Sequence, residues 1–308
     1  RPPRSTLFPY TTLFRSRYLE TQMYLAFDGD EEYERSKEIL AFIEERNTIY
    51  PDLKARSIPY IPNVLTNRML EQEYNVIVDQ YKLPIGLSYS EVSPFYMNFA
   101  QLGAIGLCGG EKRGHYNFIA NLLHQLDKRN DSQPCKVYIF DDVTRKYKSL
   151  SELSIVKKYT LDVEEIESTL MGWQALLENR YQAMLDETEA YDNSLLMLII
   201  QNNEVAKYIS EDMDLNNFYT EMLEKYKALN VCVIFANYSN TAISYEAPEP
   251  IREIKKNRHF IYFDDLDNLK VCDVNYDYIR AYKKKLSVGD AYYIDDNSLM
   301  KLRLVKDE

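Results

Sequence analysis

Short apolar runs that alternate with amphipathic helical stretches constrain this chain more than any other feature of its sequence. A run such as Val231-Cys-Val-Ile-Phe-Ala236 has no charged position, which is typical of a strand covered on both faces. A chain that alternates such strands with helices folds as a mostly parallel sheet with helices on both sides. The predicted strands lie at 96–99, 104–108, 136–140, 195–200, 231–236 and 260–263. The sequence therefore predicts an α/β fold.

Helices are predicted between these strands from the spacing of apolar residues. Steps of three and four residues mark 163–184 and 215–229, and a further helix is expected over 114–126. Near the end of the chain, runs at 291–294 and 301–305 flank Asp295-Asp-Asn-Ser298, a composition typical of a turn between antiparallel strands. We therefore expect a doubly wound, mostly parallel sheet with flanking helices and a C-terminal β-hairpin.

Glycine is concentrated directly after the predicted strand at 104–108. Five of the nine glycines lie between Gly103 and Gly114. Gly109 and Gly114 have the spacing of G-x-x-x-x-G-K-[ST], the loop whose backbone N–H groups hold phosphate between a strand and a helix. His115 takes the place of the lysine, and Tyr116 takes the place of the small hydroxyl residue. The sequence therefore predicts the glycine spacing of a phosphate-binding loop without the lysine and the small hydroxyl residue that act on phosphate and Mg²⁺.

The loop nevertheless keeps some attraction for an anion. A histidine with a pKa of about 6.5 is mostly neutral at neutral pH. Lys112 and Arg113 supply positive charge, and a helix N-terminus favours an anion. The alternative is a bare turn with both of these side chains exposed. The candidate nucleotide-binding residues here are Gly109, Gly110, Glu111, Lys112, Arg113, Gly114, His115 and Tyr116.

A second position bears on the same hypothesis. A P-loop ATPase carries an acidic residue after an apolar strand, where it holds the Mg²⁺-bound water and polarises the nucleophile. The strand at 195–200 leads instead into Gln201-Asn-Asn-Glu204, and amides replace a metal-linked carboxylate badly. Glu204 comes late for this role and suits the first turn of the next helix. We include Gln201 and Asn202 in the candidate site, expect weak ATP binding at most, regard Mg²⁺ binding as doubtful and assign no catalytic residue.

Other polar residues at strand ends are weaker candidates. Asn237 follows the strand at 231–236 and is a candidate polar sensor for phosphate, with an ordinary loop asparagine as the alternative. Asp141 and Asp142 follow the strand at 136–140, where paired acids suit a solvated helix start. The four cysteines and three histidines form no C-x-x-C or H-E-x-x-H pattern. We therefore predict no metal site and interpret the cysteines as small, reduced core residues.

The first part of the chain predicts a separate unit. Residues 1–16 resemble the translation of a sequencing-adapter oligonucleotide, and we leave them out of the fold prediction. Residues 17–48 contain an alternating strand pattern at Met23, Leu25 and Phe27, followed by a helical stripe at Ile39, Phe42 and Ile43, and look like the tail of an upstream domain. Prolines mark 49–75 as a linker or a strap on a neighbour. Residues 76–308 are the main domain.

Charge and hydropathy restrict the function. Leaving out residues 1–16 removes three arginines and takes the formal net charge from −11 to −14. An acidic surface repels a phosphate backbone, and we find no basic stripe, so nucleic-acid binding is disfavoured. The longest strongly apolar run, at 195–200, is far shorter than the roughly twenty residues of a transmembrane helix, so we expect this part of the protein to be soluble.

Several short segments, taken in their order along the chain, resemble segments of a known protein family. They are Lys82-Leu-Pro-Ile-Gly-Leu-Ser-Tyr-Ser-Glu-Val92, Val137-Tyr-Ile-Phe-Asp-Asp142, Leu150-Ser-Glu-Leu153, Tyr159-Thr-Leu-Asp-Val-Glu-Glu165, Glu178-Asn-Arg-Tyr181, Gly289-Asp-Ala-Tyr-Tyr293 and Lys301-Leu-Arg-Leu-Val305. In this order they resemble the FtsK/SpoIIIE-type ATPases, and more closely the last ATPase domain of the EssC coupling proteins of type VIIb secretion. The resemblance covers nearly all of 17–308.

This resemblance implies a RecA-like P-loop NTPase fold at the cytoplasmic C-terminus of a membrane-anchored, hexameric motor. It also implies upstream ATPase domains in the same chain and secreted helical-hairpin partners of the WXG100 type. It places Gly109, Gly114, His115 and Tyr116 on the Walker A motif and Gln201 and Asn202 at the end of Walker B. Both motifs depart from those of an active ATPase.

The sequence therefore predicts a module that recognises secreted substrates and regulates the motor, with weak or no ATP hydrolysis. The first alternative is a working ATPase in which Lys112 or Arg113 and Glu204 take over the missing roles. The second is a DNA translocase domain of the FtsK kind, against which the net charge of −14 argues.

Overall fold

The computed structural model describes residues 27, 31–51, 59–74, 76–110, 112–188, 192–238, 247–270, 274–282, 285–296 and 298–307. The chain divides into two compact units, 1–58 and 59–308. The predicted strand residues Met23 and Leu25, together with Glu111 and Cys272, lie outside the described residues.

The first unit contains the predicted helix, α1 (Glu32–Ile49), and none of its residues is buried. Ile39, Phe42 and Ile43 of the predicted stripe are each 40% or more exposed. Phe42 meets Phe27, with ring centroids 5.6 Å apart. The apolar stripe of α1 is therefore largely open to solvent in this unit.

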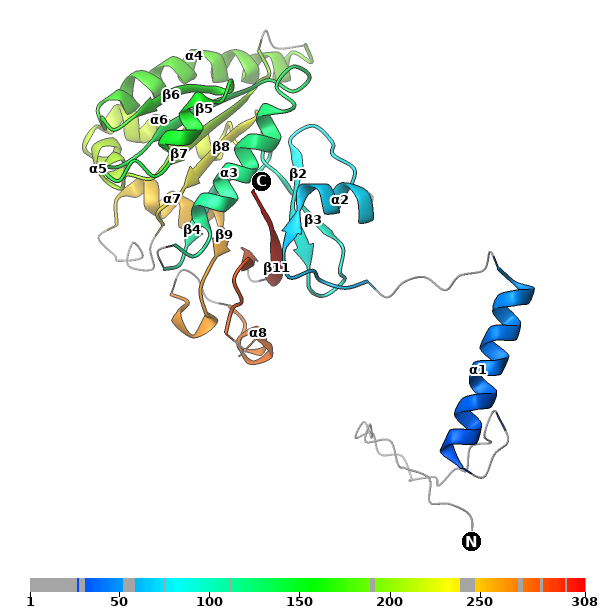
Figure 1. The fold of residues 1–308 in the computed structure, drawn as a ribbon. Helices are drawn as coiled ribbons and strands as arrows, with labels where there is room; N and C mark the ends of the chain where they lie inside the picture. Colours follow the sequence, from blue (N-terminus) through cyan, green and yellow to red (C-terminus); the bar gives the residue numbers. More distant parts are fainter. Residues whose placement is uncertain are drawn as a thin grey trace. The chain divides into compact units, whose positions relative to one another are not determined.

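The second unit is built on one sheet, formed in the described part of the chain by eleven strands in the order β3-β2-β11-β10-β9-β4-β8-β7-β5-β6, with β1 paired to β11 (Figure 1). The strands are β1 (Leu65–Thr66), β2 (Lys82–Ser88), β3 (Pro94–Asn98), β4 (Gly103–Cys108), β5 (Cys135–Phe140), β6 (Val156–Thr160), β7 (Leu195–Ile200), β8 (Val231–Phe235), β9 (His259–Tyr262), β10 (Asp290–Asp295) and β11 (Ser298–Lys306).

Parallel pairing runs from β9 through β4, β8, β7 and β5 to β6. The other side of the sheet is antiparallel, from β9 through β10 and β11 to β2 and β3. The predicted strands are confirmed by β3, β4, β5, β7, β8 and β9. The predicted C-terminal hairpin is confirmed by the antiparallel pairing of β10 with β11.

Helices cover both faces of the sheet, as predicted for a doubly wound fold. They are α2 (Asn67–Glu73), α3 (His115–Asp127), α4 (Glu165–Leu185), α5 (Glu204–Glu211), α6 (Met213–Glu224), α7 (Glu249–Asn257) and α8 (Tyr276–Ala281), with short 3₁₀ turns at Lys148–Glu152 and Leu266–Asn268. One core cluster contains the apolar residues of α3, and a second contains those of α4, α5, α6 and α7. Along β7, Leu195, Met197 and Ile199 belong to the first cluster, whereas Leu196, Leu198 and Ile200 belong to the second.

The segment 49–75 contains β1 and α2. Residues from Pro59 belong to the second unit. Leu65 and Leu70 are each 1% exposed and pack with Leu87 and Val305. The last proline of this segment is Pro62, so helix formation is not prevented beyond it. Thr66 accepts a hydrogen bond from the Met69 N–H and caps α2.

The structure shows where the cysteines lie and how apolar the helices are. Cys108, Cys135 and Cys232 are buried, which confirms the interpretation of these three cysteines as core residues. Burial raises the pKa of the Cys135 thiol to about 12, so this thiol is protonated at neutral pH. Within the described ranges, no helix has both the length and the apolar character required to cross a bilayer.

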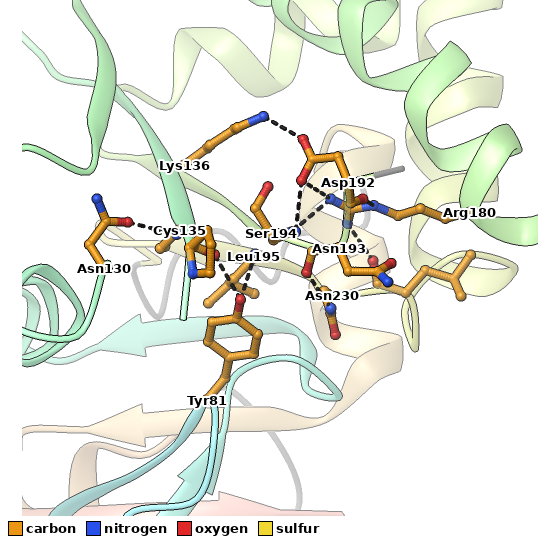
Figure 2. A network of polar contacts seen from close by, with 12 residues as sticks. Tyr81, Asn130, Cys135, Lys136, Arg180, Asp192, Asn193, Ser194, Leu195 and Asn230 are labelled. Carbon is orange, nitrogen blue, oxygen red and sulfur yellow. Dashed lines mark hydrogen bonds and ion pairs between the residues drawn. The ribbon is translucent and has the colours of Figure 1, made fainter. Parts of the chain in front are cut away.

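Arg180, near the end of α4, fixes the amino ends of the central strands (Figure 2). Its guanidinium is 1% exposed and donates to the carbonyl oxygens of Asp192 at 2.6 Å, Ser194 at 2.7 Å and Leu229 at 2.8 Å. The carboxylate of Asp192 lies 3.7 Å from this guanidinium and 2.5 Å from Lys136 Nζ. Because these carbonyls come just before β7 and β8, one side chain ties α4 to two strands.

We expect Arg180→Leu to lower the free energy of unfolding by about 3 kcal/mol, since three carbonyl oxygens lose a charged donor. Urea unfolding at neutral pH measures this loss. Arg252→Leu is the matched control, because Arg252 is half-exposed on α7 and pairs with Glu249, and such a pair contributes about 1 kcal/mol or less. Equal stability losses in the two variants would contradict the role given to Arg180.

Candidate functional site

The predicted site residues gather at one edge of the sheet, where the parallel strands end. β4 lies between β8 and β9 in the sheet. The next strand in the chain, β5, is not a neighbour of β4, because β8 and β7 lie between them. Ligands of open α/β sheets bind outside the carboxyl ends of the strands at such a change of direction. Residues 109–114 follow β4, 201–203 follow β7 and 236–238 follow β8, so the fold brings these segments to a common edge.

The glycine loop forms a strand-to-helix turn, as predicted. Gly109 has φ 127° and Gly114 has φ 135°, conformations that strain any residue with a side chain. A Cβ atom at Gly114 would lie 3.0 Å from Cδ1 of Phe263, and one at Gly109 would lie 3.2 Å from the backbone of Phe263. Phe263 directly follows β9, and its N–H donates to the Cys108 carbonyl at 2.9 Å. The glycines are therefore needed to pack the loop against Phe263.

His115, at the lysine position, is turned into the protein. It is 5% exposed, and its ring centroid lies 4.4 Å from that of Phe263. Its Nδ1 is buried and finds no hydrogen-bond partner among the described residues. Burial lowers the pKa of His115 to about 3, with a further contribution from the positive charge of Lys146. His115 is neutral at physiological pH and supplies no positive charge to a phosphate.

The remaining charge of the loop is partly cancelled. Arg113 Nη2 lies 3.8 Å from Asp264 Oδ1, and a Cβ atom at Gly110 would lie 3.5 Å from Asp264 Oδ2. A carboxylate at the loop repels a phosphate and neutralises part of the charge of Arg113. Lys112, with φ 59°, is exposed and has no salt bridge with any described residue.

Tyr116, at the position of the small hydroxyl residue, contacts the segment after β5. Its hydroxyl lies 2.9 Å from Ser149 Oγ, and its ring stacks on Tyr147 with centroids 6.0 Å apart. The side chain therefore forms part of an aromatic contact with a neighbouring loop.

The amides predicted to end Walker B are held by local contacts. Gln201 is 7% exposed, and its Nε2 donates to Asp142 Oδ2 at 3.0 Å. Asn202 Oδ1 accepts from the Glu204 N–H at 3.0 Å, where α5 begins. Glu204 is the first residue of α5 and pairs with Lys207 at 2.7 Å, which confirms the helix-start interpretation. Asn237 is exposed, between buried Ala236 and Tyr238.

Our interpretation of Asp141 as a solvated helix start was wrong. It is 1% exposed, and its carboxylate accepts from the Tyr147 N–H at 2.8 Å, the Tyr159 hydroxyl at 3.0 Å and the Asp142 N–H at 2.9 Å. Burial alone would raise the pKa of Asp142, but hydrogen bonds from Thr144 and Gln201 outweigh it and lower this pKa. In the sequence, only two acidic residues after an apolar strand could be seen. This pattern does not distinguish a buried, hydrogen-bonded aspartate from a solvated one.

The described residues do not fit a magnesium-bound triphosphate. At the lysine position the buried imidazole is neutral, and a carboxylate lies against the loop.

The buried neutral state of His115 makes stability depend on pH. Because the pKa is about 6.5 in the unfolded chain and about 3 in the folded one, stability is complete above the unfolded value and is lost as the pH falls from 6.5 toward 3. We expect this residue to contribute a loss on the order of 2 kcal/mol between pH 7 and about pH 4.5. The loss should be absent from His115→Phe. Urea unfolding of both proteins at the two pH values tests this, and parallel pH profiles would show that His115 titrates normally.

Comparisons with known proteins agree with this fold. No protein-family model matches the chain. The ESX secretion system protein YukB of Bacillus subtilis is 19% identical over 289 residues, which cover 92% of this chain. The solved structure of EssC ATPases 2 and 3 from Geobacillus thermodenitrificans has a TM-score of 0.67 at 16% identity, and the match covers 92% of this chain. EccC ATPases 2 and 3 from Thermomonospora curvata, in complex with a signal sequence peptide, have a TM-score of 0.59 at 16% identity over 91% of the chain.

The chain spans only part of these relatives. It covers 19% of the Bacillus protein, 53% of the Geobacillus chain and 50% of the Thermomonospora chain. The fold class predicted from the sequence is confirmed, with a RecA-type order of parallel strands and helices on both faces. The predicted resemblance is confirmed as well, and the chain is similar in sequence and fold to the ATPase domains of EssC-type secretion proteins.

Proposed function

We propose that this chain is a binding and regulatory module of a type VII secretion motor, with the shape of an ATPase domain and little or no ATP hydrolysis. The observation that carries the proposal is the neutral, buried His115 against Phe263 at the position where a P-loop has its lysine. It is supported by the amide at the end of β7, which is bonded to Asp142.

Loss of turnover follows from electrostatics. Phosphoryl transfer is catalysed by positioning and by positive charge at the phosphates, from a lysine and a metal ion. Removing one preorganised donor typically costs on the order of 10²- to 10³-fold in rate. Here the lysine and the Walker B carboxylate are both replaced by neutral groups, and Asp264 adds a negative charge beside the loop.

Recognition of secreted proteins is the remaining role that we assign. The Thermomonospora relative was solved with a signal sequence peptide. By analogy we propose that helical WXG100-type secreted proteins bind the 76–308 region. We further propose that 17–48 ends an upstream ATPase domain, and that the complete protein is an oligomer anchored at the cytoplasmic face of the membrane. The likeness in fold and the 92% coverage by a secretion protein support these assignments.

Hydrolysis is tested by phosphate release and by calorimetric titration of ATP with Mg²⁺ into the complete chain. We expect background turnover and weak binding at most, because no lysine or acidic metal ligand occupies the required positions. Glu204→Gln and Lys112→Ala should change neither measurement. A magnesium-dependent turnover that Glu204→Gln and Lys112→Ala abolish would favour the working ATPase.

Substrate recognition is tested by fluorescence anisotropy with purified WXG100-type proteins from the same genome. We expect saturable binding that is unaffected by ATP and Mg²⁺. Duplex DNA at low salt is the control ligand, for which electrostatic affinity is greatest and for which the acidic chain should show none. Binding of DNA, together with no binding of any secreted protein, would favour the translocase alternative.

A further inference from the structure

A groove lies beside the glycine loop, on the side away from β8. Its volume is about 450 Å³. It is lined by the loop at 112–114, by residues 63–65 at the start of the second unit, by the turn before β10, and by β11. This volume is within the range of pockets that bind small ligands or a few side chains of a partner.

The walls of the groove are held in place by partly buried hydrogen bonds. Arg303 Nη1 donates to the Asn63 carbonyl at 2.9 Å and to the Val288 carbonyl at 2.8 Å, which joins two walls to β11. Asn117 Nδ2 donates to the Val305 carbonyl at 2.7 Å and joins α3 to the same strand. A partner would therefore meet a preformed surface, which lowers the entropy cost of binding.

The accessible charge of the groove is positive, in contrast to the acidic chain. Of the described residues, Asp290 is the one acidic residue in its lining, and its side chain is fully buried and paired with Arg303 at 2.9 Å and with Lys301 at 3.0 Å. Lys112 and Lys306 are exposed and form no salt bridge with any described residue. Two cations that have no counterion among the described residues are thus available to a ligand.

Aliphatic residues line the same groove. Val288 is 97% exposed and Val64 is 53% exposed, whereas Leu65 and Leu304 of the same lining are buried. Among the described residues, no aromatic side chain lines the groove, so none of their rings is available to stack on a nucleobase. Aliphatic contacts together with cations suit a peptide better than a nucleotide.

We propose that this groove binds an acidic peptide segment of a partner protein, which places aliphatic side chains against Val64 and Val288 and carboxylates near Lys112 and Lys306. The proposal rests on the recognition role given above and adds the place and the chemistry of that recognition. The loop that resembles a phosphate-binding loop thereby forms one wall of a peptide site.

Selection from a displayed library of random peptides tests this proposal. The complete chain is the bait for peptides of about twelve residues, the length of roughly three helical turns. Lys112→Glu/Lys306→Glu is the counter-selection bait. Lys157→Glu/Lys255→Glu is the control, because it makes the same change in charge at exposed lysines outside the groove.

We expect the selected peptides to be rich in aspartate, glutamate and aliphatic residues. Their affinity should fall at least about tenfold in Lys112→Glu/Lys306→Glu and in Val288→Asp, and should stay unchanged in the control. It should also fall as salt is raised. The proposal is overturned if no peptide distinguishes the wild-type chain from the groove variant, or if the selected peptides are basic. It is equally overturned if the groove variant abolishes ATP binding while no peptide is enriched, which would assign the groove to a nucleotide.

Purified WXG100-type proteins separate failure of this inference from failure of the proposed function. Equal binding of such a protein to the wild type, the groove variant and the control would retain the function and overturn the groove. Enriched acidic peptides that need Lys112 and Lys306, with no binding of any secreted protein, would retain the groove and overturn the proposed partner.

Discussion

Burial of both faces of the central parallel strands is the constraint on which the rest of this domain depends. Every residue of β7 is 1% exposed or less, and alternate residues enter the core clusters on opposite sides of the sheet. Each such side chain contributes about 1.5–3 kcal/mol, so one strand supplies a stabilisation comparable to the net stability of a typical domain. The order of the strands within this buried sheet brings the glycine loop, Gln201 and Asn237 to one edge.

Phe263 explains why a glycine frame is present where the phosphate chemistry is missing. The positive φ angles of Gly109 and Gly114 and the close approach of Phe263 each require glycine, whether or not a phosphate binds. Replacing either glycine would force a side chain into the ring or backbone of Phe263. A glycine spacing typical of a P-loop therefore reports a strand-to-helix turn with close packing, and its lysine and hydroxyl residues have to be judged separately.

The charged groups around the loop are arranged differently from those of a nucleotide site. His115 is neutral and packed inward, Arg113 faces Asp264, and Lys112 lines the groove beside Lys306. Positive potential is thus displaced from the carboxyl end of β4 toward the groove next to β11. In a chain with a net charge of −11, such a local reversal of sign favours association with an acidic partner.

Local pattern determined much of this protein without a structure. Continuous apolar runs predicted β4, β7 and β8, because a strand buried on both faces tolerates no charge, and residue types alone excluded the usual lysine and carboxylate of an ATPase. Contacts between distant segments were decided only by the tertiary structure. Residues 65–73 join the second unit through Val305, Asp141 is buried by Tyr147 and Tyr159, and Phe263 closes on a loop far from it in sequence. Such outcomes depend on which strands become neighbours, and sequence periodicity specifies the faces of each element but not its partners.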